Sequence, residues 1–193
     1  MAVLDRVLTT IAGLRDFFMA RNASEMARAF NLLVESSPEN APKVPDWEPV
    51  EYAYNRLFIG PNSVVAAPVA SIYIETEPYV MGNTTLSVRR LYETIGLVSP
   101  WQGALPEDHL ALELDACRQM RTNLAGGGSP DLLAIYRFLV ESHMAEWIPS
   151  FVAKVAADSQ TPEVIGWVCR RLEDWLIRER QWVARQEGDE SKK

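Results

Sequence analysis

Histidine and cysteine are scarce in this chain, which has two of each among 193 residues. The sequence therefore offers few general bases and few dependable ligands for a transition metal. Basic residues are also outnumbered, because 19 lysines and arginines face 26 acidic residues and leave a net charge of −7. Nucleic-acid binding needs clustered positive charge. The composition therefore predicts no nucleic-acid partner, whereas a basic partner is compatible with it.

Long apolar stretches are missing as well. No segment is long enough to span a membrane, and charges such as Asp5 and Arg15 interrupt the N-terminal stretch, where a secretory signal would be apolar. Cys117 and Cys169 lie among apolar neighbours in helix-like segments, which is typical of reduced, buried thiols and not of a disulfide. We therefore expect a cytoplasmic protein without stable insertion in a membrane.

Helical periodicity dominates the rest of the sequence. Apolar residues recur at spacings of three and four along most of the chain, and a hydrophobic content of 48% is sufficient for one core. The pattern predicts an all-α fold, a single-domain helical bundle over residues 1–187. Several prolines predict a flexible proline-rich loop at 38–49, and a disordered tail is expected at 188–193.

Capping residues and prolines predict where individual helices begin and end. Ser24 is a candidate N-cap for the second helix, Asn83 or Thr84 is a candidate for a later one, and Gly96 is expected at the end of that helix. Pro149 is expected to begin a separate short helix. Further expected elements are helices at 50–58 and 106–124, a helix at 131–147 that is apolar nearly all round and buried, and a short extended piece at 71–75.

Catalytic arrangements find little support in the sequence. Asp108 and His109 have the residue types of a partial triad, but adjacent residues of a helix point about 100° apart, so Asp108 cannot orient that imidazole. No Gly-x-Ser-x-Gly elbow is present, and the glycine-rich segment 125–130 lacks the Lys-Ser/Thr pair that ends a phosphate-binding loop. We therefore expect no enzymatic activity and no cofactor.

A metal site has more support in the sequence than these catalytic arrangements. His109 with Glu113, and His143 with Glu146, each lie about one helical turn apart, and a hairpin about Gly127 brings both histidines to the same end. A metal-binding helical enzyme therefore stays open as an alternative. Ordinary polarity at helix ends is the more common meaning of such a set, and His143 alone is more typical of a hydrogen-bonded core histidine.

Two clusters are suited to binding a peptide. Tyr54, Leu57 and Phe58 share one helix face, which is either part of the core or the wall of a groove. Glu107 and Asp108 place carboxylates at the expected start of a helix, where capping also accounts for them. If the two clusters form one surface, they must be neighbours in space, and Asp108 must be a replaceable charge that pairs with a basic group of the peptide.

At these clusters the sequence resembles the TorD/DmsD/NarJ family of redox-enzyme maturation chaperones, and DmsD-type members in particular. An aromatic-x-x-Leu-Phe segment is present at residues 54–58. A Glu-Pro-x-Asp-His segment is present at 105–109, with Leu105 where glutamate is usual. Further matching segments, in family order and at similar distances, are GP at 60–61, SIYIE at 71–75, MGNTTLSVRRLYETIGL at 81–97, LPEDHLALEL at 105–114 and HMAEWIPSF at 143–151.

The resemblance implies a cytoplasmic, all-α chaperone that is a monomer or a homodimer. Its partners would be the twin-arginine signal peptide and the apo form of the catalytic subunit of a molybdenum- or tungsten-containing oxidoreductase. A helical peptide-binding adaptor for another partner is the alternative with the same composition. The peptide-binding surface that the resemblance implies comprises Tyr54, Leu57, Phe58, Pro68, Pro106, Glu107, Asp108 and His109.

Overall fold

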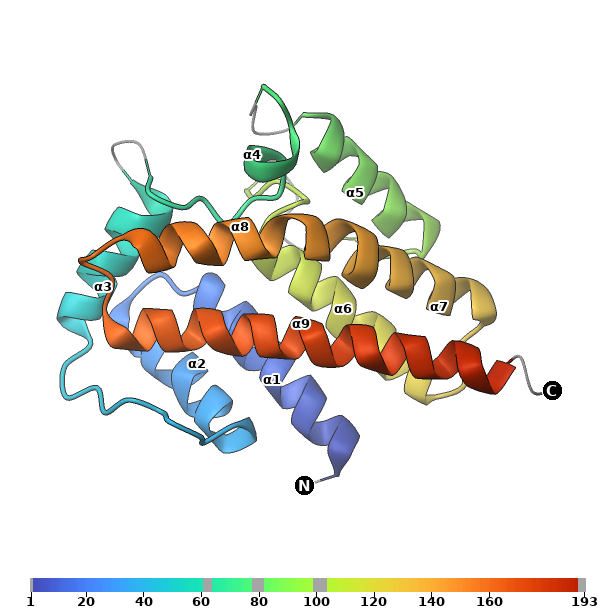
Figure 1. Ribbon diagram of the computed structural model, residues 1–193, viewed down its shortest axis with the longest axis horizontal. Helices are drawn as coiled ribbons and strands as arrows, with labels where there is room; N and C mark the ends of the chain where they lie inside the picture. The colour runs from blue at the N-terminus through green and yellow to red at the C-terminus, as the bar shows by residue number, and fades with distance from the viewer. Residues whose placement is uncertain (1, 61–63, 78–81, 99–103, 191–193) are drawn as a thin grey trace.

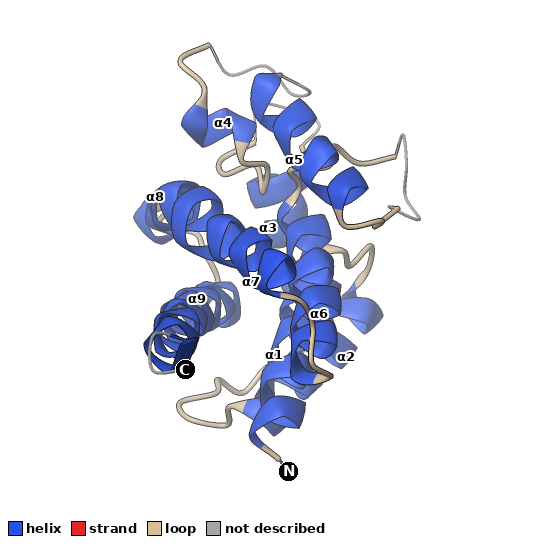
Figure 2. Cartoon of the chain, turned by 90° about the vertical axis from the view of Figure 1, so that its right-hand side faces the viewer, coloured by secondary structure: helices blue, strands red, loops and turns tan. Residues whose placement is uncertain are grey.

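Helices form the described part of the chain (Figures 1 and 2). The computed structural model describes residues 2–60, 64–77, 82–98 and 104–190. Its elements are α1 (Val3–Phe18), α2 (Ala23–Ser36), α3 (Glu48–Tyr54), the π-helical segment η1 (Asn55–Ile59), α4 (Ser71–Ile74), α5 (Asn83–Thr94), α6 (Leu110–Ala125), α7 (Pro130–Arg137), the π-helical segment η2 (Phe138–His143), α8 (Met144–Ala157) and α9 (Glu163–Glu190). Within these residues the β structure is one isolated bridge between Val69 and His109. The predicted all-α fold is confirmed.

Two layers of helices enclose the core. α7, η2 and α8 form one continuous rod beside the long α9, and α1, α2 and α6 lie behind them (Figures 1 and 2). α1 packs directly on α2, α6 and α9, and α4 lies against α5 and α8. The core includes aliphatic side chains with no exposed surface, among them Ile11, Leu14, Leu114 and Val168. Burial of such residues is the main favourable contribution to the stability of the fold.

Aromatic rings join α1, η1 and α8. The rings of Phe18, Phe58 and Phe151 lie with their centroids 5.7 to 5.8 Å apart. Tyr54 packs edge-on against Phe58 at 4.9 Å, and Trp147 lies 5.8 Å from Phe151. The edge-to-face pairs among them, Phe18 with Phe58, Phe18 with Phe151 and Tyr54 with Phe58, each add about 0.5–1.5 kcal/mol to the stability that burial alone provides. The apolar face predicted at residues 54–58 is therefore part of the core.

A buried ion pair links α6 to α9. The Arg121 Nε atom lies 2.8 Å from Glu179 Oε2, and the two side chains are only 7% and 2% exposed. The guanidinium of Arg121 also lies 3.6 Å from the ring centroid of Trp182, and the Tyr136 hydroxyl donates to Glu179 at 2.6 Å. Each buried charge thus has partners, which is the condition under which such a pair is tolerated. The network fixes how α6, α7 and α9 lie together.

The rod formed by α7, η2 and α8 corrects two predictions. Pro149 lies inside α8 and does not begin a separate helix. The helix continues because Trp147, Ile148 and Phe151 are fully buried, so packing outweighs the hydrogen bond that proline lacks. The stretch before Pro149 is also not buried all round, because Phe138 is 54% exposed.

Two predicted helix caps are wrong, and side chains outside the expected positions explain why. The N-cap of α2 is Asn22, whose Oδ1 accepts a hydrogen bond from the Glu25 amide at 2.9 Å, and not Ser24. At the start of α5, the amide of Thr84 donates to Glu75 Oε1 at 2.7 Å, so the cap comes from a residue nine positions earlier. Local propensity identifies the right region, whereas three-dimensional contacts select the partner.

The turn at Gly96, the loop at 37–47 and the C-terminal end agree with the prediction only in part. Gly96 has a φ of +68°, the left-handed conformation expected after α5. The loop at 37–47 is held to the bundle by a hydrogen bond from Trp167 Nε1 to the Glu39 carbonyl at 3.1 Å. α9 continues to Glu190, so residues 188–190 of the expected tail are helical, and 191–193 lie outside the described residues.

Cys117 and Cys169 are free and buried, as predicted, and burial raises the pKa of Cys169 to about 12. Among the described residues, no helix combines the length and the apolar character that crossing a bilayer requires.

The aromatic packing predicts a large effect of Phe151→Ala. Removing this fully buried ring leaves a cavity between α1, η1 and α8, and we expect the free energy of unfolding to fall by about 3–5 kcal/mol. Urea unfolding followed by circular dichroism measures it. Ile177→Ala, at a position that is 52% exposed on α9, is the control and should change stability by less than about 0.5 kcal/mol. Equal stability of the two variants would contradict the packing described here.

Candidate functional site

The segment Pro106–His109 forms a turn that leads into α6. The helix begins at Leu110 and not at residue 106, and Nδ1 of His109 caps it by accepting a hydrogen bond from the Ala111 amide at 3.2 Å. The amide of Leu110 donates to the Pro68 carbonyl at 2.9 Å. The structure therefore brings Pro68 beside this turn, although 38 positions or more separate them in the sequence.

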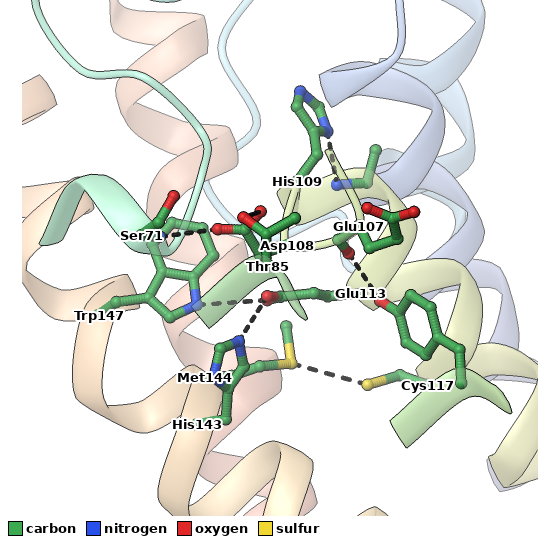
Figure 3. A network of polar contacts seen from close by, with 12 residues as sticks. Ser71, Thr85, Glu107, Asp108, His109, Glu113, Cys117, His143, Met144 and Trp147 are labelled. Carbon is green, nitrogen blue, oxygen red and sulfur yellow. Dashed lines mark hydrogen bonds and ion pairs between the residues drawn. The ribbon is translucent and has the colours of Figure 1, made fainter. Parts of the chain in front are cut away.

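Asp108 occupies the centre of the turn and is fully buried. Its Oδ2 accepts a hydrogen bond from the Ser71 amide at 2.8 Å, and its Oδ1 accepts one from Thr85 Oγ1 at 2.7 Å (Figure 3). The carboxylate thus caps α4 and holds α5, which explains why residues 71–74 form a helix and not the expected extended piece. Asp108 is therefore buried and hydrogen-bonded within the chain, and its part in peptide binding stays a prediction.

The negative charge of Glu107 is paired with a positive charge of the same chain. Both of its carboxylate oxygens accept hydrogen bonds from Arg89, at 2.8 and 2.9 Å, and this contact holds the pKa of Glu107 below its ordinary value. The Tyr92 hydroxyl donates to the Glu107 carbonyl at 3.1 Å. Because Arg89 and Tyr92 belong to α5, Glu107 fastens the same helix that Asp108 holds through Thr85.

The predicted apolar residues lie inside the protein. Tyr54, Leu57 and Phe58 are 2%, 0% and 6% exposed, so their face is core in this structure. They are linked to the turn through residues 66–70, since the Ala66 amide donates to the Leu57 carbonyl at 2.9 Å and Val69 forms the bridge with His109. The two predicted clusters are therefore connected, but mainly through buried contacts.

A second buried polar group joins α6 to the rod. Glu113 accepts hydrogen bonds from His143 Nε2 at 2.6 Å and from Trp147 Nε1 at 3.2 Å (Figure 3). His143 is therefore a hydrogen-bonded core histidine, as predicted. Its partner is Glu113 and not Glu146, so the pairing assumed for a metal site is not the one found. The described residues contain no group of three or more potential metal ligands.

The two histidines have pKa values shifted in opposite directions. Burial lowers the pKa of His109 to about 4, against a weaker opposing effect of Asp108. Burial also lowers the pKa of His143, but the charge and the hydrogen bond of Glu113 outweigh it, so this pKa lies above its ordinary value. Burial raises the pKa of Glu113, and contact with His143 offsets only part of the rise.

A groove of about 250 Å³ opens between α5 and the rod. Its lining is mainly apolar, and η2 supplies a large part of it. The polar groups at its edge include Glu146, which is exposed. Sequence reasoning missed this groove, because the 131–147 stretch gave no sign that Phe138 would be exposed. The lining residues are Ile74, Asn83, Thr84, Ser87, Val88, Leu91, Phe138, Leu139, Ser142, His143 and Glu146.

Residues 10–153 match the family model of the nitrate reductase delta subunit. The chain belongs to this family. The family includes the TorD, NarJ and DmsD proteins, as the sequence resemblance indicated. The matched region runs from α1 into α8 and includes the Asp108 turn, the aromatic cluster and every residue that lines the groove.

Comparison with individual proteins agrees with membership of the nitrate reductase delta subunit family. The chain is 31% identical over 103 residues to the DmsD Tat proofreading chaperone of Haemophilus influenzae, and 29% identical over 105 residues to that of Salmonella typhi. These matches cover 53% and 54% of this chain and 47% and 48% of the relatives, so the chain spans about half the length of each.

A solved structure shows the same fold. The crystal structure of a redox enzyme maturation protein from Archaeoglobus fulgidus superposes with a TM-score of 0.61 and 20% sequence identity. The superposition covers 89% of this chain and 93% of the other. The likeness therefore extends over the whole bundle, beyond the half of the chain that aligns with the DmsD sequences.

Asp108 in this family member is predicted to stabilise the fold together with Thr85. Asp108→Ala leaves buried donors without an acceptor and should lower the free energy of unfolding by about 1–3 kcal/mol. Thr85→Val removes one of the same hydrogen bonds, so the double variant should lose at least about 0.5 kcal/mol less than the sum of the single losses. Urea unfolding of the four proteins measures this coupling. Strictly additive losses would show that the two side chains act independently.

The histidines are predicted to titrate far apart in nuclear magnetic resonance spectra. His109 should titrate near pH 4, and His143 above about 6.5, the ordinary histidine pKa. By linkage, His143 contributes stability that is present below pH about 6.5 and is lost as the pH rises through its raised folded-state pKa. The contribution of His109 has the opposite sign, because its pKa is lowered in the folded state. The free energy of unfolding therefore decreases as the pH falls below about 6.5. His143→Gln assigns the signals, and a common midpoint for both rings would refute the assignment.

Proposed function

We propose that this chain is a cytoplasmic chaperone that binds the twin-arginine signal peptide of a molybdenum- or tungsten-containing oxidoreductase subunit. In this role it holds the apo subunit and assists its maturation before export, as a monomer or a homodimer. The observation that carries the proposal is the family match, because it spans both sequence clusters and every element around the groove. The DmsD relatives, named as Tat proofreading chaperones, support the same role.

The chemistry of such a peptide fits this chain. A twin-arginine signal presents paired guanidinium groups before an apolar stretch, so its receptor needs carboxylates beside an apolar surface. The chain has a net charge of −7, which attracts a basic segment. It also has a mainly apolar groove with the exposed Glu146 at its edge.

Binding, and not catalysis, is the role that the buried polar groups support. Asp108, His109, Glu113 and His143 have the residue types of acids and bases, yet each forms a hydrogen bond within the fold. Their contacts hold helices in place. In the proposed function they are positioning residues, which act on the peptide through the helices that they fix.

The sequence-predicted peptide-binding set takes an indirect part in this proposal. Tyr54, Leu57, Phe58 and Pro68 support the interior on which α4 and the Pro106–His109 turn lie. Glu107 and Asp108 anchor α5, the helix that forms one wall of the groove. Substitutions in this set are therefore expected to change peptide binding together with stability.

Calorimetric titration tests the proposed function. The probe is a synthetic peptide in which paired arginines precede an apolar segment, and the control peptide has alanines in place of the arginines. We expect the arginine peptide to bind at least about tenfold more tightly, a difference of about 1.4 kcal/mol, and the difference to shrink as salt screens the charges. Equal binding of both peptides would favour the helical adaptor instead, and no binding of either would contradict the proposal.

A further inference from the structure

We infer that the groove between α5 and the η2–α8 junction receives the signal peptide, with its apolar stretch against Phe138, Val88 and Leu91 and an arginine at Glu146. The inference rests on the proposed function and names the surface that performs it. It moves direct peptide contact away from the residues that the sequence predicted, which are mostly buried.

The apolar wall of the groove contains a large side chain that the fold leaves uncovered. Phe138 is 54% exposed, although full burial of a phenylalanine side chain is worth about 1.5–3 kcal/mol. It lies at the first position of η2, which also contributes Leu139, Ser142 and His143 to the groove. π-Helical segments within α-helical rods are rare and occur frequently at functional sites. An apolar peptide segment seated here would cover Phe138.

The charge at the edge of the groove selects the kind of peptide. The ionisable residues among its lining are His143 and Glu146. His143 is buried and hydrogen-bonded to the buried Glu113, so Glu113 already balances the charge of this ring inside the protein. Glu146 is exposed and has no ion pair among the described residues. A guanidinium group can therefore pair with Glu146, whereas an acidic segment or a second copy of this chain, with its net charge of −7, is disfavoured.

The buried contacts around Asp108 fix the opposite wall. α5 contributes Val88 and Leu91 to the groove, and it is fastened by Thr85 to Asp108 and by Arg89 to Glu107. The groove therefore lies between a helix held by these two carboxylates and a rod held by the Glu113 pair. This arrangement explains how the polar Pro106–His109 turn can serve peptide binding without exposing its own side chains.

Two groove variants and two matched controls test the inference by titration with the arginine and alanine peptides. Glu146→Gln should weaken binding of the arginine peptide about fivefold to tenfold and leave the alanine peptide unchanged, because only the former presents the guanidinium partner. Phe138→Ala should weaken both peptides about tenfold. The controls Asp5→Asn, at an exposed acid on α1, and Ile177→Ala, which matches the exposure of Phe138, should stay within about twofold of the wild type.

Thiol protection locates the peptide directly. Ser142→Cys introduces an exposed thiol in the groove, whereas the native Cys117 and Cys169 are buried and react slowly. Saturating arginine peptide should slow alkylation of this thiol strongly, and should not slow alkylation of a thiol introduced by Ala184→Cys on the exposed face of α9. Melting curves of all variants confirm that each protein is folded.

The outcomes separate this inference from the proposed function. If the wild type binds the arginine peptide but the thiol at position 142 stays unprotected, or Glu146→Gln and Phe138→Ala bind like the wild type, the groove is the wrong surface while the proposed function stands. If the wild type binds neither peptide, both are overturned. Protection at position 142 together with arginine-dependent weakening in Glu146→Gln supports both.

Discussion

The buried carboxylate of Asp108 is the constraint on which the positions of α4 and α5 depend. An ionised group without partners in the interior costs several kcal/mol, so the Ser71 amide and the Thr85 hydroxyl must both be in place when Asp108 is buried. These two donors belong to α4 and α5. Their positions decide where Tyr73 stacks on Trp147, at 5.7 Å between centroids, and where the wall of the groove lies. The short α4 exists because this carboxylate caps it.

Periodicity predicted the bundle well because long amphipathic helices carry their own signal. α1, α6 and α9 follow from apolar spacing alone. The predicted secondary structure was wrong where contacts with residues distant in the sequence outweigh the local conformational preference. The β-branched residues at 71–75 favour an extended backbone, but Asp108, 37 positions later, caps a helical turn there. Pro149 is a strong local stop, yet the buried aromatic residues around it keep the rod continuous.

The sequence predicted that its two clusters would be neighbours in space, but it did not predict their geometry. The family resemblance selected Pro106–His109 and residues 54–58, and these segments do meet through residues 66–70. Burial could not be inferred, because the partners of Asp108 and Glu107 lie 18 to 37 positions away. The helical period of residues 131–147 did not predict the π-helical η2, so the exposure of Phe138 and the groove beside it appeared only in three dimensions.

The ion pair between Arg15 and Asp115, 2.6 Å long, joins α1 to a helix 100 positions later. At a translation rate of roughly 5–20 residues per second, the ribosome needs about 5–20 s to make the intervening chain. α1 and α2 are therefore made before the surfaces of α6 and α9 against which α1 packs. Until those helices are made, the surface of α1 that packs on α6 and α9 has no partner within the chain, and apolar surface left open in this way favours aggregation.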